Sequence, residues 1–193
     1  KYGYGSAINP CIDCRIFMFK RAKEYMKEIG AQFIFTGEVL GQRPMSQRTH
    51  PMRVIENDSD MEGLLLRPLS AKRLPATVPE KEGWVDREQL GNIQGRSRQE
   101  QMRLAREYGI EEYPSPAGGC CFLTDKNFAR RIMDFFDHEG KENLTMDDVM
   151  LLKIGRHFRL SSECKVVMGR EEGENKFLNR YAPGRWKMET LDV

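Results

Sequence analysis

The sequence predicts an α/β protein, in which a domain with a parallel sheet is followed by a small α+β domain. The first observation is the order helix, glycine, apolar strand and loop over residues 15–37, which is typical of α/β sheets. The second is an apolar run at residues 63–69 that ends near a proline and predicts another buried strand. The third is a polar stretch at residues 138–143, which predicts a boundary between domains 1–140 and 141–193.

The composition is that of a soluble globular protein. Lys and Arg number 31 against 29 Asp and Glu among 193 residues, so the net charge of +2 does not by itself require a nucleic-acid partner. No apolar run approaches the roughly 18 to 20 residues of a membrane span, and the first residues lack a signal peptide's apolar core. We therefore expect a cytoplasmic protein without a membrane partner, whose 5 cysteines stay reduced.

Apolar residues at helical spacing predict the helices, and continuous apolar runs predict the strands. In the first domain they predict helix 15–29, a strand within 31–40, a short helix through 52–55, strand 63–69, and helices 87–90 and 96–108. A helix through 128–136 follows, with Thr124 or Asp125 as its cap. In the second domain they predict a short helix or strand at 147–152, strands 157–160 and 165–168, helix 171–178 and a closing strand 185–189.

Four cysteines lie in two loops that each precede a predicted helix. Cys11 and Cys14 stand three residues apart before the first helix, where a helix N-terminus favours thiolates. Cys120 and Cys121 follow a Pro-Gly loop about a hundred residues later. Three thiolates would bind zinc or an iron–sulfur cluster and leave one position open, whereas without a metal one thiolate would carry a persulfide that another resolves. A structural zinc, or burial as small hydrophobic residues, is the alternative.

Residues at predicted strand ends are candidates for a binding site, because ligands gather at the carboxyl ends of parallel strands. Thr36, Gly37 and Glu38 end the first strand. Basic residues at strand ends or in loops can hold RNA phosphates, and those of the first domain are Arg43, Arg48, Arg67, Lys72 and Arg73. By contrast, Cys164 is predicted to be a core residue, and His50, His138 and His157 to be structural or surface groups.

Two motifs resemble the PP-loop family of tRNA thiolation enzymes, the 2-thiouridylases and 4-thiouridine synthases, which have an adenine-nucleotide alpha-hydrolase fold. The first is Asn9-Pro10-Cys11-x-x-Cys14, followed by Gly30-Ala31-x-Phe33-x-x-Thr36-Gly37-Glu38. The second, Gly119-Cys120-Cys121-Phe122-Leu123-Thr124-Asp125, resembles the loop that supplies the later catalytic cysteine in that family. The resemblance covers about residues 5–137, and both motifs occur in the family's order.

The resemblance implies ATP-dependent sulfur transfer to a tRNA uridine, with the sulfur supplied by a donor protein or as sulfide. Cys14 and either Cys120 or Cys121 would be catalytic, and Cys11 would join them in holding a [4Fe–4S] cluster or zinc, or in the persulfide route. Thr36, Gly37 and Glu38 would contact the nucleotide. The family binds ATP and magnesium through a Ser-Gly-Gly-x-Asp-Ser loop that these 193 residues do not contain. We therefore expect a fragment of a PP-loop ATPase-type sheet domain that does not catalyse alone.

The C-terminal residues resemble the small RNA-binding domain called NFACT-R. The resemblance lies in Leu152-x-Ile154-Gly155-Arg156-His157-Phe158-Arg159-Leu160 and in Val167-Met168-Gly169-Arg170-x-x-x-x-Glu174-Asn175-x-x-Leu178. It implies that this domain holds RNA, with backbone contacts from Arg156, Arg159, Lys165 and Arg170. Two rival hypotheses remain, a non-catalytic RNA-binding module with a structural zinc and a Cys-x-x-Cys redox protein. The sequence leaves open whether the protein is a homodimer.

Overall fold

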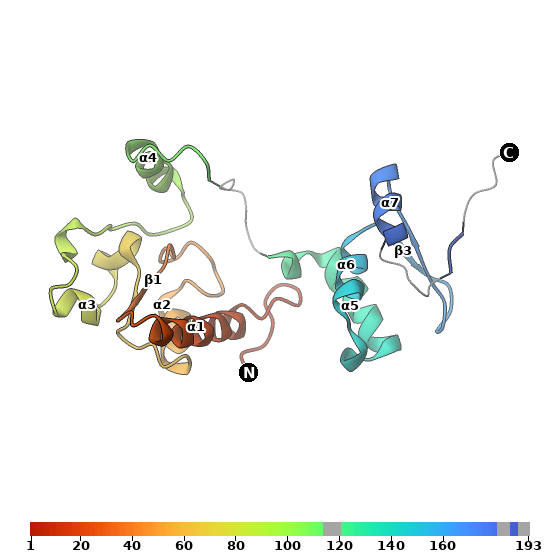
Figure 1. Ribbon diagram of the computed structural model, residues 1–193, viewed down its shortest axis with the longest axis horizontal. Helices are drawn as coiled ribbons and strands as arrows, with labels where there is room; N and C mark the ends of the chain where they lie inside the picture. Colours follow the sequence, from red (N-terminus) through yellow and green to blue (C-terminus); the bar gives the residue numbers. More distant parts are fainter. Residues whose placement is uncertain (114–120, 181–185, 189–193) are drawn as a thin grey trace. The chain divides into compact units, whose positions relative to one another are not determined.

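The computed structural model describes residues 1–113, 121–180 and 186–188 (Figure 1). The chain forms two compact units, Lys1–Gly119 and Cys120–Val193. Within the described ranges, no helix combines the length and the apolar character that a membrane crossing requires.

The first unit is mixed α/β. Its elements are α1 (Cys11–Glu28), β1 (Ile34–Phe35), α2 (Thr49–Asp58), β2 (Leu65–Leu66), the 3-10 helix η1 (Pro68–Arg73), α3 (Val78–Lys81), the 3-10 helix η2 (Arg87–Gln89) and α4 (Gln99–Glu107). Strands β1 and β2 pair in parallel, with Ile34 opposite Leu65. Helix α1 packs on α2 and β1 (Figure 1), around a core of Ile16, Phe19, Met26, Ile55, Met61 and Leu65.

The predicted parallel pair of strands is confirmed, but both strands are shorter than the apolar runs suggested. Each strand has only two residues, because Pro68 starts η1 after β2 and the chain leaves β1 for a loop after Phe35. Helix α1 begins at Cys11 rather than at residue 15, with the Cys14 N–H donating to the Pro10 carbonyl at 2.8 Å. The thiols therefore belong to the first turn of the helix itself. A larger sheet of the PP-loop ATPase type stays a prediction.

Helix α4 differs from its prediction in burial. The sequence predicts Met102, Leu104 and Ala105 on a buried face, yet no residue of α4 is buried in the described part of the chain. The helix also carries Arg103, whose charge is balanced by ion pairs with Glu100 at 3.0 Å and Glu107 at 2.6 Å. Amphipathic spacing alone does not show whether another element covers the apolar side.

The second unit joins helices to an antiparallel hairpin. Its elements are the 3-10 helix η3 (Phe122–Thr124), α5 (Lys126–Glu139), the 3-10 helix η4 (Lys141–Asn143), α6 (Met146–Lys153), β3 (Arg156–Arg159), β4 (Lys165–Met168) and α7 (Glu172–Arg180). As predicted, Asp125 caps α5, accepting the Phe128 N–H at 2.7 Å. Helix α5 packs on α6, and Phe128, Ile132, Phe135, Leu151 and Leu152 are buried.

Two C-terminal predictions have different outcomes. The two predicted strands are confirmed, the first one residue earlier than predicted, and they pair as an antiparallel hairpin, with Arg156 opposite Met168 and Arg159 opposite Lys165. The closing strand is not found in its described part, because residues 186–188 have no regular structure; residues 185 and 189 lie outside the described residues. Helix α5 belongs to the second compact unit, so the two units divide earlier in the chain than the predicted boundary at 140/141. As a boundary between family domains, 140/141 stays a prediction.

Candidate functional site

A tight loop before α1 holds the first of the two thiols. The Asn9 side chain, only 2% exposed, donates from Nδ2 to the Cys11 Sγ at 3.1 Å and accepts the Ala7 N–H at 3.2 Å. The Gly5 N–H closes the loop on the Asn9 carbonyl at 3.0 Å. A Cβ at Gly5 would collide with the Asn9 carboxamide, so only glycine fits there without a shift. An N–H donor beside sulfur offsets the negative charge that a thiolate carries.

Cys11 and Cys14 differ in access to solvent. Both are free thiols in the first turn of α1, Cys11 half-buried and Cys14 exposed. Two thiols at positions i and i+3 lie on the same side of a helix. The exposed thiol is therefore open to a reaction partner, while the half-buried one is held by the loop.

The predicted strand-end residues lie beside this helix. The Thr36 N–H pairs with the Leu66 carbonyl at 2.9 Å, and the Thr36 hydroxyl accepts the Glu38 N–H at 3.2 Å. Gly37 is exposed, and a Cβ at this position would lie in open space. The backbone of this turn is therefore accessible at the carboxyl end of β1.

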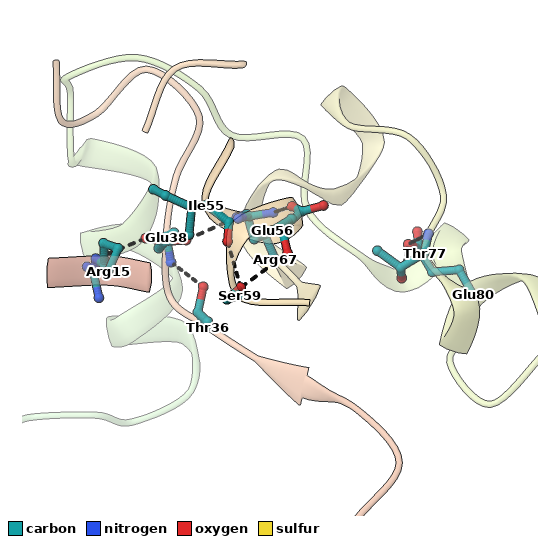
Figure 2. A network of polar contacts seen from close by, with 9 residues as sticks. All are labelled: Arg15, Thr36, Glu38, Ile55, Glu56, Ser59, Arg67, Thr77 and Glu80. Carbon is teal, nitrogen blue, oxygen red and sulfur yellow. Dashed lines mark hydrogen bonds and ion pairs between the residues drawn. The ribbon is translucent and has the colours of Figure 1, made fainter. Parts of the chain in front are cut away.

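Glu38 points inward and organises a network of charges (Figure 2). Its Oε2 pairs with the Arg67 Nε at 3.0 Å and its Oε1 with the Arg15 Nε at 3.2 Å; the Glu38 and Arg67 side chains are only 4% and 3% exposed. Arg67 also pairs with Glu56, which gives two carboxylates for two guanidinium groups. Since Arg15 directly follows Cys14, the network ties the thiol-bearing helix to the ends of both strands. Sequence reasoning singled out Glu38, which follows a strand-end glycine, but it missed Arg15 and Glu56. The available signal for them was Glu38 itself.

The predicted RNA contacts of the first unit vary in their availability. Lys72 pairs with Glu88 at 3.2 Å, and the Arg73 Nε lies 3.5 Å from the Asn92 carbonyl. Arg48 is exposed just before α2, and Arg43 is half-buried. Arg67 was also a candidate, but it is buried and paired with Glu38 and Glu56, so it is not available to a phosphate. Of the other four, Lys72 has its charge balanced by a carboxylate and is the weakest candidate.

The later cysteines belong to the second unit. Cys121 is exposed and immediately precedes η3, where its carbonyl accepts the Thr124 N–H at 3.0 Å. Cys120 lies outside the described residues. Among the described residues, no three His, Cys, Asp or Glu side chains are grouped to hold a metal. Whether these cysteines join Cys11 and Cys14 therefore stays a prediction.

Two of the predicted RNA contacts in the C-terminal domain are engaged internally. Arg159 donates to both Asp134 oxygens, at 3.1 and 2.9 Å, and Lys165 pairs with the same carboxylate at 2.7 Å. The hydrogen bonds from Arg159, with Lys165 nearby, hold the pKa of the Asp134 carboxyl well below its usual range. Arg159 and Lys165 thus attach the hairpin to α5.

Arg156 and Arg170 are placed differently. Arg156 pairs with Met168 through the ladder of β3 and β4, but its side chain is exposed and forms no hydrogen bond or ion pair with any residue that the structure describes. The Arg170 side chain donates weakly to the Gly155 carbonyl at 3.4 Å. The Asn175 side chain accepts the Gly169 N–H at 3.1 Å, and the Glu174 side chain accepts the Arg170 N–H at 2.7 Å. The Glu-Asn pair therefore fixes the loop that carries Arg170.

Two further predictions concern Cys164 and His157. Cys164 is not a core residue: it is exposed in the turn between β3 and β4, because the apolar run that follows it begins only at Val166. His157 was predicted to be a structural or surface group, and it is half-buried, with its Nε2 2.8 Å from the Ile154 carbonyl. Burial, reinforced by Arg131 and Lys165, lowers the pKa of His157 to about 4.

Comparison with known proteins matches the two ends of the chain to two family models. Residues 6–73 match the model described as thiamine biosynthesis protein (ThiI), and residues 155–193 match the NFACT protein RNA binding domain. The curated tRNA-specific 2-thiouridylases MnmA from Lactococcus lactis subsp. cremoris strains MG1363 and SK11 are each 25% identical over 160 residues. That alignment covers 81% of this chain but only 38% of each relative. No solved structure matches the chain.

These matches agree with the geometry. The ThiI match contains the Asn9 loop, both thiols of α1 and the Glu38–Arg67 network, and the NFACT match contains the β3–β4 hairpin. The resemblance predicted from the motifs is therefore confirmed. The N-terminal part of the chain therefore matches the ThiI family model, the C-terminal part matches the model of the NFACT RNA binding domain, and the chain has weak similarity to PP-loop tRNA 2-thiouridylases.

Proposed function

We propose that this chain is part of an ATP-dependent tRNA sulfurtransferase, in which Cys11 and Cys14 handle sulfur and the C-terminal domain holds tRNA. The observation that carries the proposal is the pair of thiols in the first turn of α1, one exposed and one held by Asn9. The ThiI match over residues 6–73 and the tRNA-specific 2-thiouridylases among the relatives support it.

The proposed reaction has two steps. A carbonyl oxygen of a tRNA uridine attacks the α-phosphorus of ATP, and pyrophosphate leaves with magnesium. Sulfur then attacks the carbon that bears this oxygen, and AMP departs with the oxygen. Thr36 and Gly37 meet the nucleotide through their accessible turn, while Glu38, occupied by Arg15 and Arg67, positions that turn against α1. These 193 residues lack the Ser-Gly-Gly-x-Asp-Ser motif, and none of them is assigned to the phosphates of ATP.

The thiols suit a soft metal as well as a persulfide. Cys11 and Cys14 would supply two thiolates of an iron–sulfur cluster or zinc, and Cys120 or Cys121 the third. A cluster with three protein ligands supplies an open iron for sulfur. In the metal-free route, the exposed Cys14 carries the persulfide and a second cysteine releases the sulfur, forming a disulfide that an external thiol must reduce.

The test is iron, zinc and acid-labile sulfide analysis of anaerobically purified protein. Cys11, Cys14, Cys120 and Cys121 are each changed to Ala, and Cys164→Ala is the matched control, because Cys164 is an exposed thiol outside the proposed site. We expect about four irons and four sulfides per chain. The cluster should be lost in the Cys11 and Cys14 variants and in only one of the other two, which identifies the third ligand.

Other outcomes separate the alternatives. A persulfide found on Cys14 by mass spectrometry, without metal, would support sulfur transfer by the metal-free route. One zinc per chain, without sulfide, would contradict the cluster and favour an RNA-binding module with a structural zinc. A reversible Cys11–Cys14 disulfide with neither metal nor persulfide would contradict sulfur transfer and favour a redox protein.

A further inference from the structure

The two faces of the β3–β4 hairpin differ in what they contact. Residues that pair directly across an antiparallel ladder share a face, and alternate residues along each strand change face. The register therefore places Arg159 and Lys165 on one face, with His157 and Val167. It places Arg156 and Phe158 on the other, with their partners Met168 and Val166.

The first face is fully engaged within the unit. Arg159 and Lys165 are bound to Asp134 of α5, and the His157 ring lies against the Ile154 carbonyl. Gly155, which precedes β3, has φ +69° and accepts at its carbonyl from Arg131 at 2.9 Å. These contacts hold this side of the hairpin against α5 and occupy its two cations with Asp134.

The second face, which we call the Phe158 face, consists of Arg156, Phe158, Val166 and Met168. Phe158 is 46% exposed and Met168 48% exposed. Arg156, exposed beside them, has no carboxylate partner among the described residues. Neither strand contains Asp or Glu, so the face presents an aromatic ring and a positive charge with no acidic residue of the strands to oppose an anion.

We propose that the Phe158 face binds unpaired nucleotides of RNA, with a base stacked on the Phe158 ring and a neighbouring phosphate on the Arg156 guanidinium. The inference rests on the proposed function only in taking RNA as the partner. Side chains at i and i+2 of a strand are about 6.6 Å apart along it, so ring and cation can engage adjacent parts of one strand of RNA. Aromatic stacking needs an exposed base face, which single-stranded RNA offers and a duplex hides.

Fluorescence anisotropy with the full chain tests the proposal. The probes are a fluorescein-labelled decauridylate, an abasic oligonucleotide of the same length, and an RNA duplex. Phe158→Leu keeps an apolar side chain but removes the ring, and we expect about tenfold weaker binding of decauridylate. Phe158→Trp should restore binding to within about twofold of the unchanged protein. The abasic probe should bind the unchanged protein and Phe158→Leu equally, because it retains phosphates but offers no base.

Arg156 supplies the second arm of the experiment. Arg156→Gln should weaken binding of the decauridylate and abasic probes alike and reduce the salt-dependence slope by about 0.7. Met146→Ala is the matched control, since Met146 is 74% exposed in the same unit but lies on α6. This control should leave all affinities unchanged.

The outcomes separate this inference from the proposed function. Binding of decauridylate that is unaffected by Phe158→Leu would overturn the stacking site but leave an RNA-holding domain intact. If Phe158→Leu lost affinity equally for the abasic probe and for decauridylate, the stacking site would also be overturned, because the ring would then contribute to binding without a base. Absence of binding to every RNA probe and to tRNA by the unchanged, folded protein would contradict the RNA-holding part of the proposed function itself.

Discussion

Each unit holds a carboxylate between two cationic side chains, but at different depths. Glu38 lies between Arg15 and Arg67, with the Glu38 and Arg67 side chains 4% and 3% exposed (Figure 2). Asp134 lies between Arg159 and Lys165, and its side chain is 27% exposed. Water therefore screens the Asp134 network more than it screens the Glu38–Arg67 pair. The same residue types therefore stabilise the two units to different extents.

The difference also separates cations that are paired within the protein from cations that are exposed. In the first unit the buried guanidinium of Arg67 joins the ends of β2 and β1, while Arg15 joins the latter to the helix with the thiols. In the second unit Arg159 is engaged with Asp134, whereas Arg156, only three residues earlier, is exposed. Alternation along a strand, rather than closeness in sequence, decides which cation remains available to a ligand.

The largest effect is expected when the buried network loses a charge. Glu38→Gln keeps the shape of the side chain but leaves Arg67 with Glu56 alone, and removing one partner of a buried pair costs about 3 kcal/mol or more. Urea unfolding should show this loss through Trp84, which stacks on Phe33 in the first unit. A Trp186→Phe background leaves Trp84 as the single reporter, since the chain has 2 Trp residues.

Glu100→Gln is the matched control for this change. Glu100 pairs with Arg103 on α4, but both side chains are more than half exposed, at 61% and 55%. Loss of such a surface pair should cost about 0.5 kcal/mol or less. Equal effects of Glu38→Gln and Glu100→Gln would refute the contrast between buried and exposed pairs.

An intermediate effect is expected for Asp134→Asn. The change weakens the charge-assisted bonds from Arg159 and Lys165, with an expected loss of about 1–2 kcal/mol at pH 7 in urea unfolding followed by circular dichroism. Because the folded-state pKa of Asp134 is depressed, its stabilisation is fully present above about pH 4 and is lost as the pH falls further. The two proteins should therefore converge in acid, and a constant difference down to pH 2 would contradict the role of the charge.

Much of the local structure was predictable because it depends on short-range patterns. The parallel strands, the strands at β3 and β4, and a cap at Thr124 or Asp125 follow from apolar runs and a capping residue, and the structure selects Asp125 as the cap. The two-residue length of each strand could not be predicted from the apolar runs. These runs continue further, but Pro68 ends β2 and the turn after Phe35 ends β1. Cys164 was mispredicted for a related reason, because a residue at the edge of an apolar run can sit in the turn.

The candidate site was predictable in its thiols but not in its supports. Cys11 and Cys14 stand out through spacing and position before a helix, whereas the roles of Asn9 and Arg15 depend on contacts that fold the loop and the strand ends against α1. Likewise, Arg159 and Lys165 look like phosphate contacts in sequence, and only the contact with Asp134 shows that they are occupied. Charge type is readable from sequence, but burial and pairing are tertiary properties.

The smallest effect is expected at His157, which lies on the same hairpin face as Arg159 and Lys165 but stays uncharged. Its folded-state pKa of about 4 is below the ordinary 6.5, so the unfolded chain binds more protons between these values. Stability should therefore fall as the pH drops from about 6.5 to 4, by about 1 kcal/mol after allowance for partial solvent access. Urea unfolding of His157→Gln should lack this slope, whereas His50→Gln should retain it. A slope that is unchanged by His157→Gln would contradict this prediction. It would show that burial does not keep His157 neutral, and that this face of the hairpin holds a charged imidazolium as readily as the charged Arg159 and Lys165.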